Sequence, residues 1–124
     1  MQGLVTDLYQ LTMAAGYLAA GKQSDRATFE LFFRRLPRYR NFVLACGLAQ
    51  AVEYLLSLRF TGEEIGYLRK LPQFAQTDPA FFEMLREFRF TGDVHAVREG
   101  TPVCANEPIL SVTAPLIEAQ IPET

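Results

Sequence analysis

Residues 4–21 constrain the fold of this chain more than any other part of its sequence. Thr6 and Asp7 stand where side-chain oxygens can accept hydrogen bonds from the free N–H groups of a first helical turn. Gly21 suits the left-handed conformation in which many helices end. No charged side chain occurs from Leu8 to Gly21. The stretch therefore predicts a capped, uncharged helix that other parts of the structure must cover.

This predicted helix is apolar on more than one side. Helical spacing places five apolar residues on one face, namely Leu8, Leu11, Ala15, Leu18 and Ala19. The opposite face is no more polar and consists of Tyr9, Met13, Gly16, Tyr17 and Ala20. A helix that is apolar all round is expected to be buried all round, and this one is too short and too dotted with polar groups to span a bilayer. We expect one face to pack on the domain's own sheet and the other on a second partner.

Two strands are predicted between this helix and the middle of the chain. Residues 26–35 place Phe29, Leu31 and Phe33 in alternation with other residues, which is typical of a strand with one face in the core. Residues 41–46 form a second, shorter apolar run. A loop is expected between them.

Helix and strand signals alternate in the second half as well. Helices are predicted after Gly47, over residues 63–71 and after the Asp78-Pro79 pair, where Asp78 can cap and proline suits the first helical position. Three short strands are expected after Gly92, followed by a helix or a crossover over residues 116–124. The chain is thus predicted to be one α+β domain with a mixed or antiparallel sheet and packed helices.

Composition narrows the possible partners and the compartment. The net charge of −2 argues against broad binding of nucleic acid or anionic membranes. Residues 1–5 carry no basic segment of a secretory signal, so Cys46 and Cys104 are interpreted as reduced thiols in the cytoplasm. Neither cysteine has metal-ligand spacing, and the single histidine, His95, cannot complete a zinc site. No metal-ligating residue is predicted.

Four arginines, Arg34, Arg35, Arg38 and Arg40, crowd into seven positions of one predicted loop. The planar guanidinium group matches the oxygens of a carboxylate or a phosphate, so the loop is a candidate anion site. Two other interpretations remain open. The loop is either a solvated segment with internal ion pairs or, because Tyr39 lies among the arginines, a contact for single-stranded nucleic acid.

Four ordered stretches resemble nicotinate phosphoribosyltransferases. They are TDLYQLTM at 6–13, FFRRLP at 32–37, DPAFF at 78–82 and the tail from Glu107-Pro108 to Glu123-Thr124. The resemblance implies the N-terminal α/β domain of a type II phosphoribosyltransferase over residues 1–114. Residues 115–124 would then begin the connection into a barrel domain that this chain lacks.

The resemblance also implies roles for four residues. The tyrosine that matches Tyr9 contacts the nicotinate ring in this family, and Asp7, Arg34 and Arg35 are carried over as substrate-binding residues. The position of Tyr9 in a first helical turn fits such a role, because its ring offers a flat face while the helix N-terminus favours an anion. A buried core position for Tyr9 and a capping role for Asp7 are the alternatives.

The implied reaction forms nicotinate mononucleotide from nicotinate and phosphoribosyl pyrophosphate, coupled to ATP hydrolysis, in NAD biosynthesis. ATP and magnesium would act in the complete enzyme, which is expected to be a homodimer with a shared active site. This stretch has no Gly-rich phosphate-binding loop, no acidic cluster for magnesium and no catalytic residue, since His95 does not match the family's catalytic histidine. It is therefore expected to be inactive and to bind no cofactor alone. The alternative is a truncated, non-catalytic module for dimerisation or for binding a small ligand.

Overall fold

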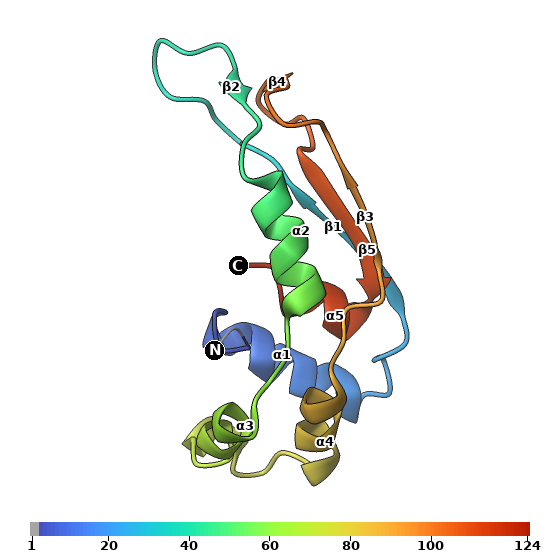
Figure 1. Ribbon diagram of the computed structural model, residues 1–124. Coiled ribbons are helices and arrows are strands. Elements are labelled where there is room, and N and C mark those ends of the chain that lie inside the picture. Colours follow the sequence, from blue (N-terminus) through green and yellow to red (C-terminus); the bar gives the residue numbers. More distant parts are fainter. Residues whose placement is uncertain (1–2) are drawn as a thin grey trace.

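The computed structural model describes residues 3–124, with most of the helices gathered at one end and the strands extending away from them (Figure 1). The helices are α1 (Leu8–Ala19), α2 (Leu48–Ser57), α3 (Gly62–Leu68), the 3-10 turn η1 (Pro72–Phe74), α4 (Pro79–Glu87) and α5 (Leu116–Gln120). The strands are β1 (Arg26–Leu31), β2 (Val43–Leu44), β3 (Asp93–Ala96), β4 (Pro102–Val103) and β5 (Leu110–Pro115). These antiparallel sheets with packed helices confirm the predicted α+β class.

The strand β5 is the centre of the main sheet, whose order is β1-β5-β3 with both pairings antiparallel. Buried residues alternate with half-buried ones along β5, as strand geometry requires when one face is covered. The edge strand β1 is less covered. Leu31 and Phe33 are 57% and 43% exposed, so the prediction that they face the core is wrong. Leu31 lines an open hollow beside α2, and Phe33 lies beyond the last paired residue of β1.

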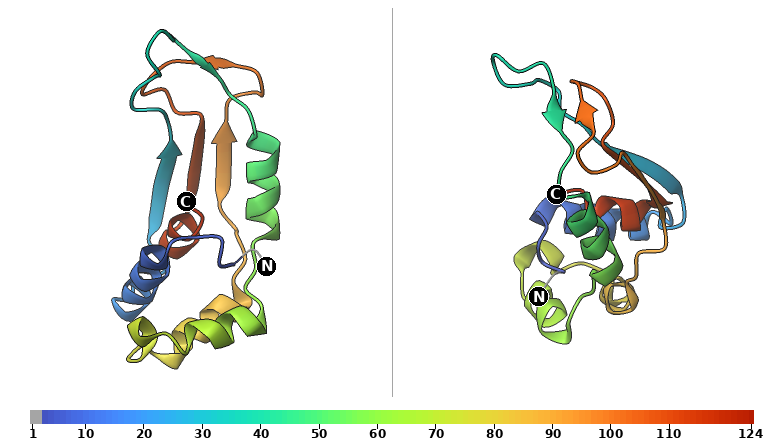
Figure 2. Two further views of the ribbon diagram at one scale, coloured as in Figure 1. Left: turned by 90° about the vertical axis from the view of Figure 1, so that its left-hand side faces the viewer. Right: turned by 45° about the horizontal axis from the view of Figure 1, so that its top comes forward.

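A second, two-stranded sheet of β2 and β4 lies at the far end of the molecule (Figure 2). The predicted strand over residues 41–46 shrinks to Val43 and Leu44, because only these two residues have partners in β4. Gly47 then adopts a left-handed conformation, with φ of 91°, and turns the chain into α2. The N-terminus of α2 is capped from a distant loop: Leu48 N–H donates to Glu99 Oε1 at 2.7 Å.

Helix α1 begins and ends where the sequence predicts. Asp7 is its N-cap, and Gly21 follows it in the left-handed conformation with φ of 68°. The amide of Lys22 donates to the Tyr17 carbonyl at 2.9 Å, which closes the helix end.

The packing of α1 differs from the prediction. Its buried residues are Gln10, Leu11 and Ala14, and Leu11 and Ala14 join a cluster built from helices and loops rather than from the sheet. Leu8 was expected in the core but is 42% exposed. The expectation of a sheet partner is wrong because α5 lies between the end of the sheet and α1 (Figure 1).

Two hydrophobic clusters hold the domain together. The first, called the helical cluster, contains Leu11, Ala14, Leu58, Phe60, Ile65, Leu68, Phe74, Phe81, Phe82, Leu85, Phe88, Ile117 and Ile121. The second, called the sheet cluster, contains Ala45, Leu48, Leu55, Val103, Ile109, Leu110, Val112, Ala114 and Ala119. Helix α5 contributes to both, through Ile117 and Ala119 respectively. The predicted domain boundary at residue 114 stays a prediction.

Candidate functional site

The first turn of α1 is the candidate site, because it presents Tyr9 beside the N-cap Asp7. Both side chains are exposed, and the Tyr9 side chain has an exposed fraction of 47%. The alternative of a core tyrosine is therefore wrong. Asp7 occupies the N-cap position of α1, and its carboxylate accepts a bond of 3.4 Å from the Thr124 hydroxyl.

Acidic groups surround the Tyr9 hydroxyl. Desolvation raises the pKa of Tyr9, and a hydrogen bond to Glu123 together with the charges of Glu123 and Asp7 raises it further, while the Gln10 side chain lowers it in part. The charged groups that act on this tyrosine are thus both carboxylates. A carboxylate ligand at this position needs a cation from another part of the protein.

Gln10 is the residue at this site that the sequence reasoning missed. Its side chain is 0% exposed, and its Oε1 accepts hydrogen bonds from the Asp7 N–H at 2.8 Å and from the Thr124 hydroxyl at 2.8 Å. The Thr6 hydroxyl donates to the same oxygen and to the carbonyl of Ile121, at 2.8 Å. The available signal was the spacing of Asp7 and Gln10, since Gln three residues after an N-cap is a capping-box pattern.

The segment that holds Gln10 also reaches Tyr9. Gln120 Nε2 donates to Glu123 Oε2 at 2.6 Å, which holds the carboxylate that interacts with the Tyr9 hydroxyl. Residues 120–124 therefore form one wall of the candidate site, and the first turn of α1 forms the other. The site is thus formed by residues near both ends of the described chain.

Arg34 and Arg35 lie elsewhere. Both are exposed in the loop between β1 and β2, which projects at the end of the sheet away from α1 (Figure 1). None of the ion pairs described within residues 3–124 includes an arginine of this loop. Arg38 stacks over the ring of Tyr39 at 5.1 Å. The structure thus leaves both predicted arginines available to an anion, but one chain does not bring them to Tyr9.

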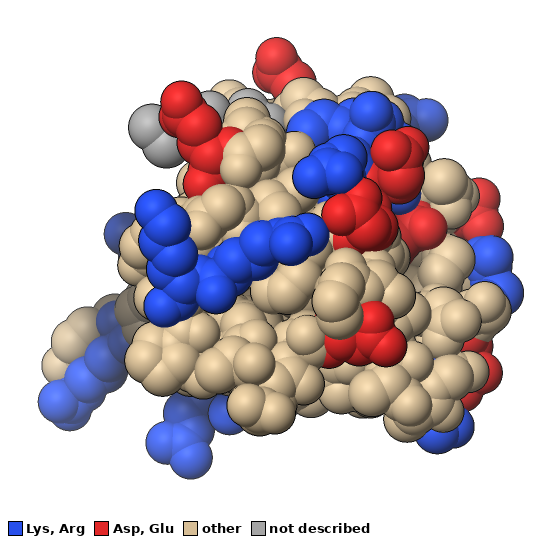
Figure 3. Space-filling view, turned by 90° about the horizontal axis from the view of Figure 1, so that it is seen from below, with Lys and Arg blue, Asp and Glu red and all other residues tan. Residues whose placement is uncertain are grey.

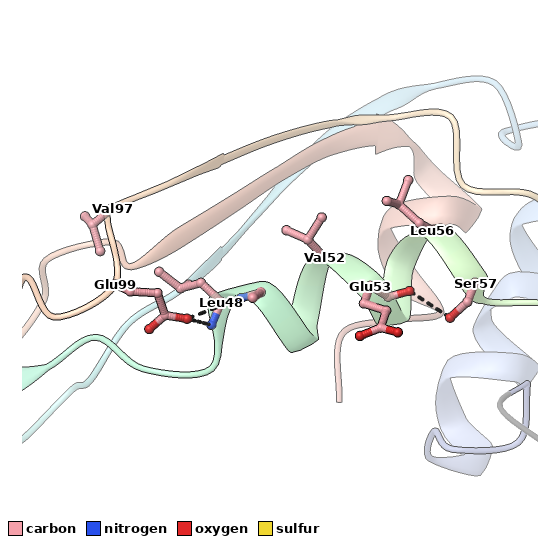
Figure 4. Close-up of a pocket in the computed structure, with 8 residues that line it drawn as sticks. Leu48, Val52, Glu53, Leu56, Ser57, Val97 and Glu99 are labelled. Atoms are coloured by element: carbon pink, nitrogen blue, oxygen red, sulfur yellow. Dashed lines mark hydrogen bonds between the residues drawn. The ribbon is translucent and has the colours of Figure 1, made fainter.

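Hollows lie on both sides of α2. One, called the C-terminal hollow, has a volume of about 520 Å³ and is lined by β1, β5, α2 and residues 122–124, including Leu31, Tyr54 and Glu123. The other has about 630 Å³ and lies along the outward face of α2, where Val52 and Leu56 point to the same side (Figure 4). The C-terminal hollow reaches the candidate site through Glu123.

The remaining candidates for chemistry are dispersed. His95 is exposed in β3 opposite Ser111, and Cys46 and Cys104 are free, exposed thiols. Residues 3–124 hold no group of three or more His, Cys, Asp and Glu side chains suited to a metal ion.

Charges are mixed on the face seen from the helical end. Basic and acidic side chains are interspersed there over a largely uncharged surface (Figure 3). No helix in the described part of the chain is long and apolar enough to cross a membrane.

Three comparisons with known proteins show which family this chain belongs to. The model of the nicotinate phosphoribosyltransferase (NAPRTase) N-terminal domain matches residues 4–124. A nicotinate phosphoribosyltransferase of Mycobacterium tuberculosis, pncB2, is 48% identical over 121 residues, which are 98% of this chain and 25% of that protein. The human nicotinate phosphoribosyltransferase is 45% identical over 123 residues, 98% of this chain and 22% of that protein.

Solved structures agree with the fold. The crystal structure of human nicotinic acid phosphoribosyltransferase superposes with a TM-score of 0.85 at 43% identity, covering 95% of this chain and 24% of that one. A nicotinate phosphoribosyltransferase from Porphyromonas gingivalis has the same fold with a TM-score of 0.63 at 19% identity, covering 97% of this chain and 29% of that one. The chain thus spans about a quarter of the length of the relatives that it matches.

Proposed function

Because the chain belongs to the family of nicotinate phosphoribosyltransferase N-terminal domains, we propose that it is the N-terminal part of an enzyme that joins nicotinate to the phosphoribosyl group of phosphoribosyl pyrophosphate. The products are nicotinate mononucleotide and pyrophosphate, in NAD biosynthesis. The observation that carries the proposal is the match over residues 4–124, which includes the first turn of α1. The proposal extends to coupling with ATP hydrolysis and to a cytoplasmic location.

Tyr9 is the proposed contact for the nicotinate ring. Its exposure of 47% at the start of α1 leaves a ring face open to a planar ligand, and the neighbouring helix N-terminus favours a negative charge. Asp7 contributes from the N-cap position of that helix, where its N–H donates to Gln10 Oε1.

The cation for the nicotinate carboxylate or for the phosphates is proposed to come from Arg34 and Arg35 of a second copy, or from the remainder of the enzyme. Support comes from the two carboxylates beside Tyr9 and from the separation of the arginine loop from α1 within one chain. A two-fold homodimer would place the arginine loop of one subunit near Tyr9 of the other, so that each site contains residues of both.

Magnesium and ATP belong to the remainder of the enzyme in this proposal, since residues 3–124 offer no suitable group of ligands. We expect the chain of 124 residues alone to lack activity. Assay the chain and a complete enzyme carrying it with nicotinate, phosphoribosyl pyrophosphate, magnesium and ATP. The complete enzyme should form nicotinate mononucleotide. If the complete enzyme forms no nicotinate mononucleotide, the proposed function is contradicted. Turnover by the chain alone at about 1 per second or faster would contradict only the expectation that activity requires the remainder of the enzyme.

The arginine role has its own test. In the complete enzyme, Arg34→Ala or Arg35→Ala should raise the KM of an anionic substrate by about tenfold or more, because a charge-assisted hydrogen bond contributes about 1.5–3 kcal/mol. The melting temperature should hardly change, since both side chains are exposed and lack ion-pair partners within the described chain. Arg38→Ala is the control, because it removes the same charge from the same loop. Equal KM changes for all three variants would indicate a general charge effect and no specific site.

Substitutions on the exposed face of α1 test whether this face forms the proposed homodimer interface. Met13 is 40% exposed one turn from Tyr9, and Met13→Asp should dissociate the complete enzyme and remove its activity, because a carboxylate would be buried at an apolar interface. Tyr9→Ala should raise the KM for nicotinate by up to about tenfold and leave the oligomer intact. Sedimentation that shows an unchanged oligomer and normal kinetics for Met13→Asp would rule out this face as the interface.

A further inference from the structure

We propose that Gln10 is a positioning residue for the nicotinate site, which couples the placement of Tyr9 to the C-terminal segment of this domain. The inference rests on the proposed function. Gln10 points into the protein from the turn that presents Tyr9 outward, so it touches no substrate itself.

The first argument is the number of donors that converge on one oxygen. Gln10 Oε1 accepts from the Asp7 N–H and from the hydroxyls of Thr6 and Thr124. These donors come from the residues just before α1 and from the last described residue, 114 positions further along the chain. A single amide therefore ties the start of α1 to the segment that carries Glu123.

The second argument is the orientation of the amide. Gln10 Nε2 is buried without a partner at hydrogen-bond distance among the described residues, which is ordinarily unfavourable. Rotating the amide by half a turn would point its NH₂ group at the Asp7 N–H and lose that bond, whereas the two threonine hydroxyls can accept hydrogen bonds as well as donate them. The bond from the Asp7 N–H therefore favours the described orientation, in which Oε1 also lies next to both threonine hydroxyls.

The third argument is a comparison with α3. Glu64 occupies the same position in that helix, is 3% exposed and accepts from the Thr61 N–H at 2.8 Å, with its Oε1 also unpaired. Its described bonds are local, to the cap of its own helix. Gln10 performs the same local capping and adds the bond to Thr124. The bond from Thr124 therefore gives Gln10 a connection to the C-terminal segment that a capping residue does not need.

The chemistry at Gln10 also favours an amide over a carboxylate. Asp7 and Glu123 already act on Tyr9, and a third carboxylate would add to the repulsion of an anionic substrate. The amide supplies the acceptor without the charge.

The test uses kinetics of the complete enzyme with Gln10→Met, which keeps the length of the side chain and removes its acceptor. We expect the KM for nicotinate to rise about three- to tenfold, within the range of one aromatic contact, while the KM for phosphoribosyl pyrophosphate and kcat change less than twofold. Thr124→Val, which removes one donor and leaves the α1 cap intact, should raise the KM for nicotinate in the same direction by a smaller factor. Thr124→Val keeps the proposal testable if Gln10→Met fails to fold.

The control is Glu64→Met, which should lower the melting temperature and leave the KM for nicotinate unchanged. In a Tyr9→Ala background, Gln10→Met should have no further effect on that KM, because the residue is proposed to act through Tyr9. An active wild-type enzyme with an unchanged KM in both Gln10→Met and Thr124→Val would overturn the inference, as would an undiminished effect in the Tyr9→Ala background. An inactive wild-type enzyme would instead overturn the proposed function.

Discussion

The helical cluster is closed, and the sheet cluster is open. The helical cluster contains large side chains with almost no exposed surface, among them Phe81, Leu58 and Leu85 at 0%. Aromatic contacts tighten it further: Phe74 stacks on Phe81 at 5.8 Å, and Phe60 meets Phe88 edge-on at 5.7 Å. The interior at this end has the close packing of a self-sufficient core.

The sheet cluster has smaller residues than the helical cluster, and some of them border an open hollow. Leu110 and Val112 are buried at 8% and 7%, yet both line the C-terminal hollow of about 520 Å³. Leu31, Leu44 and Leu56 stand exposed around this end of the molecule, at 57%, 58% and 66%. The contrast teaches that the helices supply stability, while the open sheet end and the edge of α1 offer the surfaces on which other groups can bind.

The same substitution in each cluster should give the largest difference. Leu85→Ala should lower the free energy of unfolding by close to the upper limit of the usual 2–5 kcal/mol, because Leu85 is enclosed and its loss leaves a cavity. Leu110→Ala should cost close to the lower limit, because its side chain borders a hollow that is already open. Urea denaturation of the two variants measures both values. Equal losses would mean that the sheet cluster is as closed as the helical one.

A glycine between the two clusters gives the next test. A Cβ atom at Gly92, between α4 and β3, would lie 2.7 Å from the Thr113 carbonyl oxygen and 2.4 Å from the Ala114 Cβ. Gly92→Ala should therefore destabilise the domain by about 1–3 kcal/mol by forcing β5 away. In Gly66→Ala the added methyl meets nothing within 4 Å, and this control should stabilise α3 by roughly 0.5–1 kcal/mol. Similar thermal shifts for both variants would show that β5 can yield without cost.

The closed end was the more predictable of the two from sequence. The Asp78-Pro79 signal predicted the start of α4, where Asp78 Oδ1 accepts from Ala80 N–H at 2.8 Å. Asp7 likewise occupies the N-cap position of α1, where its N–H donates to Gln10 Oε1, but its side chain makes no cap bond like that of Asp78. Caps and helical spacing act within a few residues of each other, so a single sequence contains the information that they need.

Long-range packing could not be predicted in this way. Alternation placed Leu31 on a core face of β1, but the residue is exposed because nothing in the described chain fills the adjacent hollow. Apolar spacing placed α1 against the sheet, whereas α5 occupies that position. Local patterns state which side of an element is apolar, and they do not state which element covers it.

In the candidate site, too, local features were predictable from the sequence and long-range contacts were not. The placement of Tyr9 in the first turn of α1 was predictable, because it depends on a local cap. The long-range hydrogen bond of Gln10 depends on Thr124, and the distance of the arginine loop from Tyr9 depends on the direction of β1 in the sheet (Figure 1). The binding roles of Tyr9, Asp7, Arg34 and Arg35 stay predictions.

The smallest effect is expected on the outward face of α2. Leu56 is 66% exposed beside Val52 in the hollow of Figure 4, and Leu56→Lys should change the free energy of unfolding of the chain by less than about 0.5 kcal/mol, because the lysine side chain remains in water. The neighbouring variant Leu55→Lys is the matched control. Leu55 is 4% exposed within the sheet cluster, so its replacement should cost more than about 2 kcal/mol by burying a charge. Urea denaturation of the pair measures how sharply the sheet cluster ends within α2. A loss above about 1 kcal/mol for Leu56→Lys would mean that this face is packed in solution, and the sheet end would then be more closed than its exposed leucines indicate.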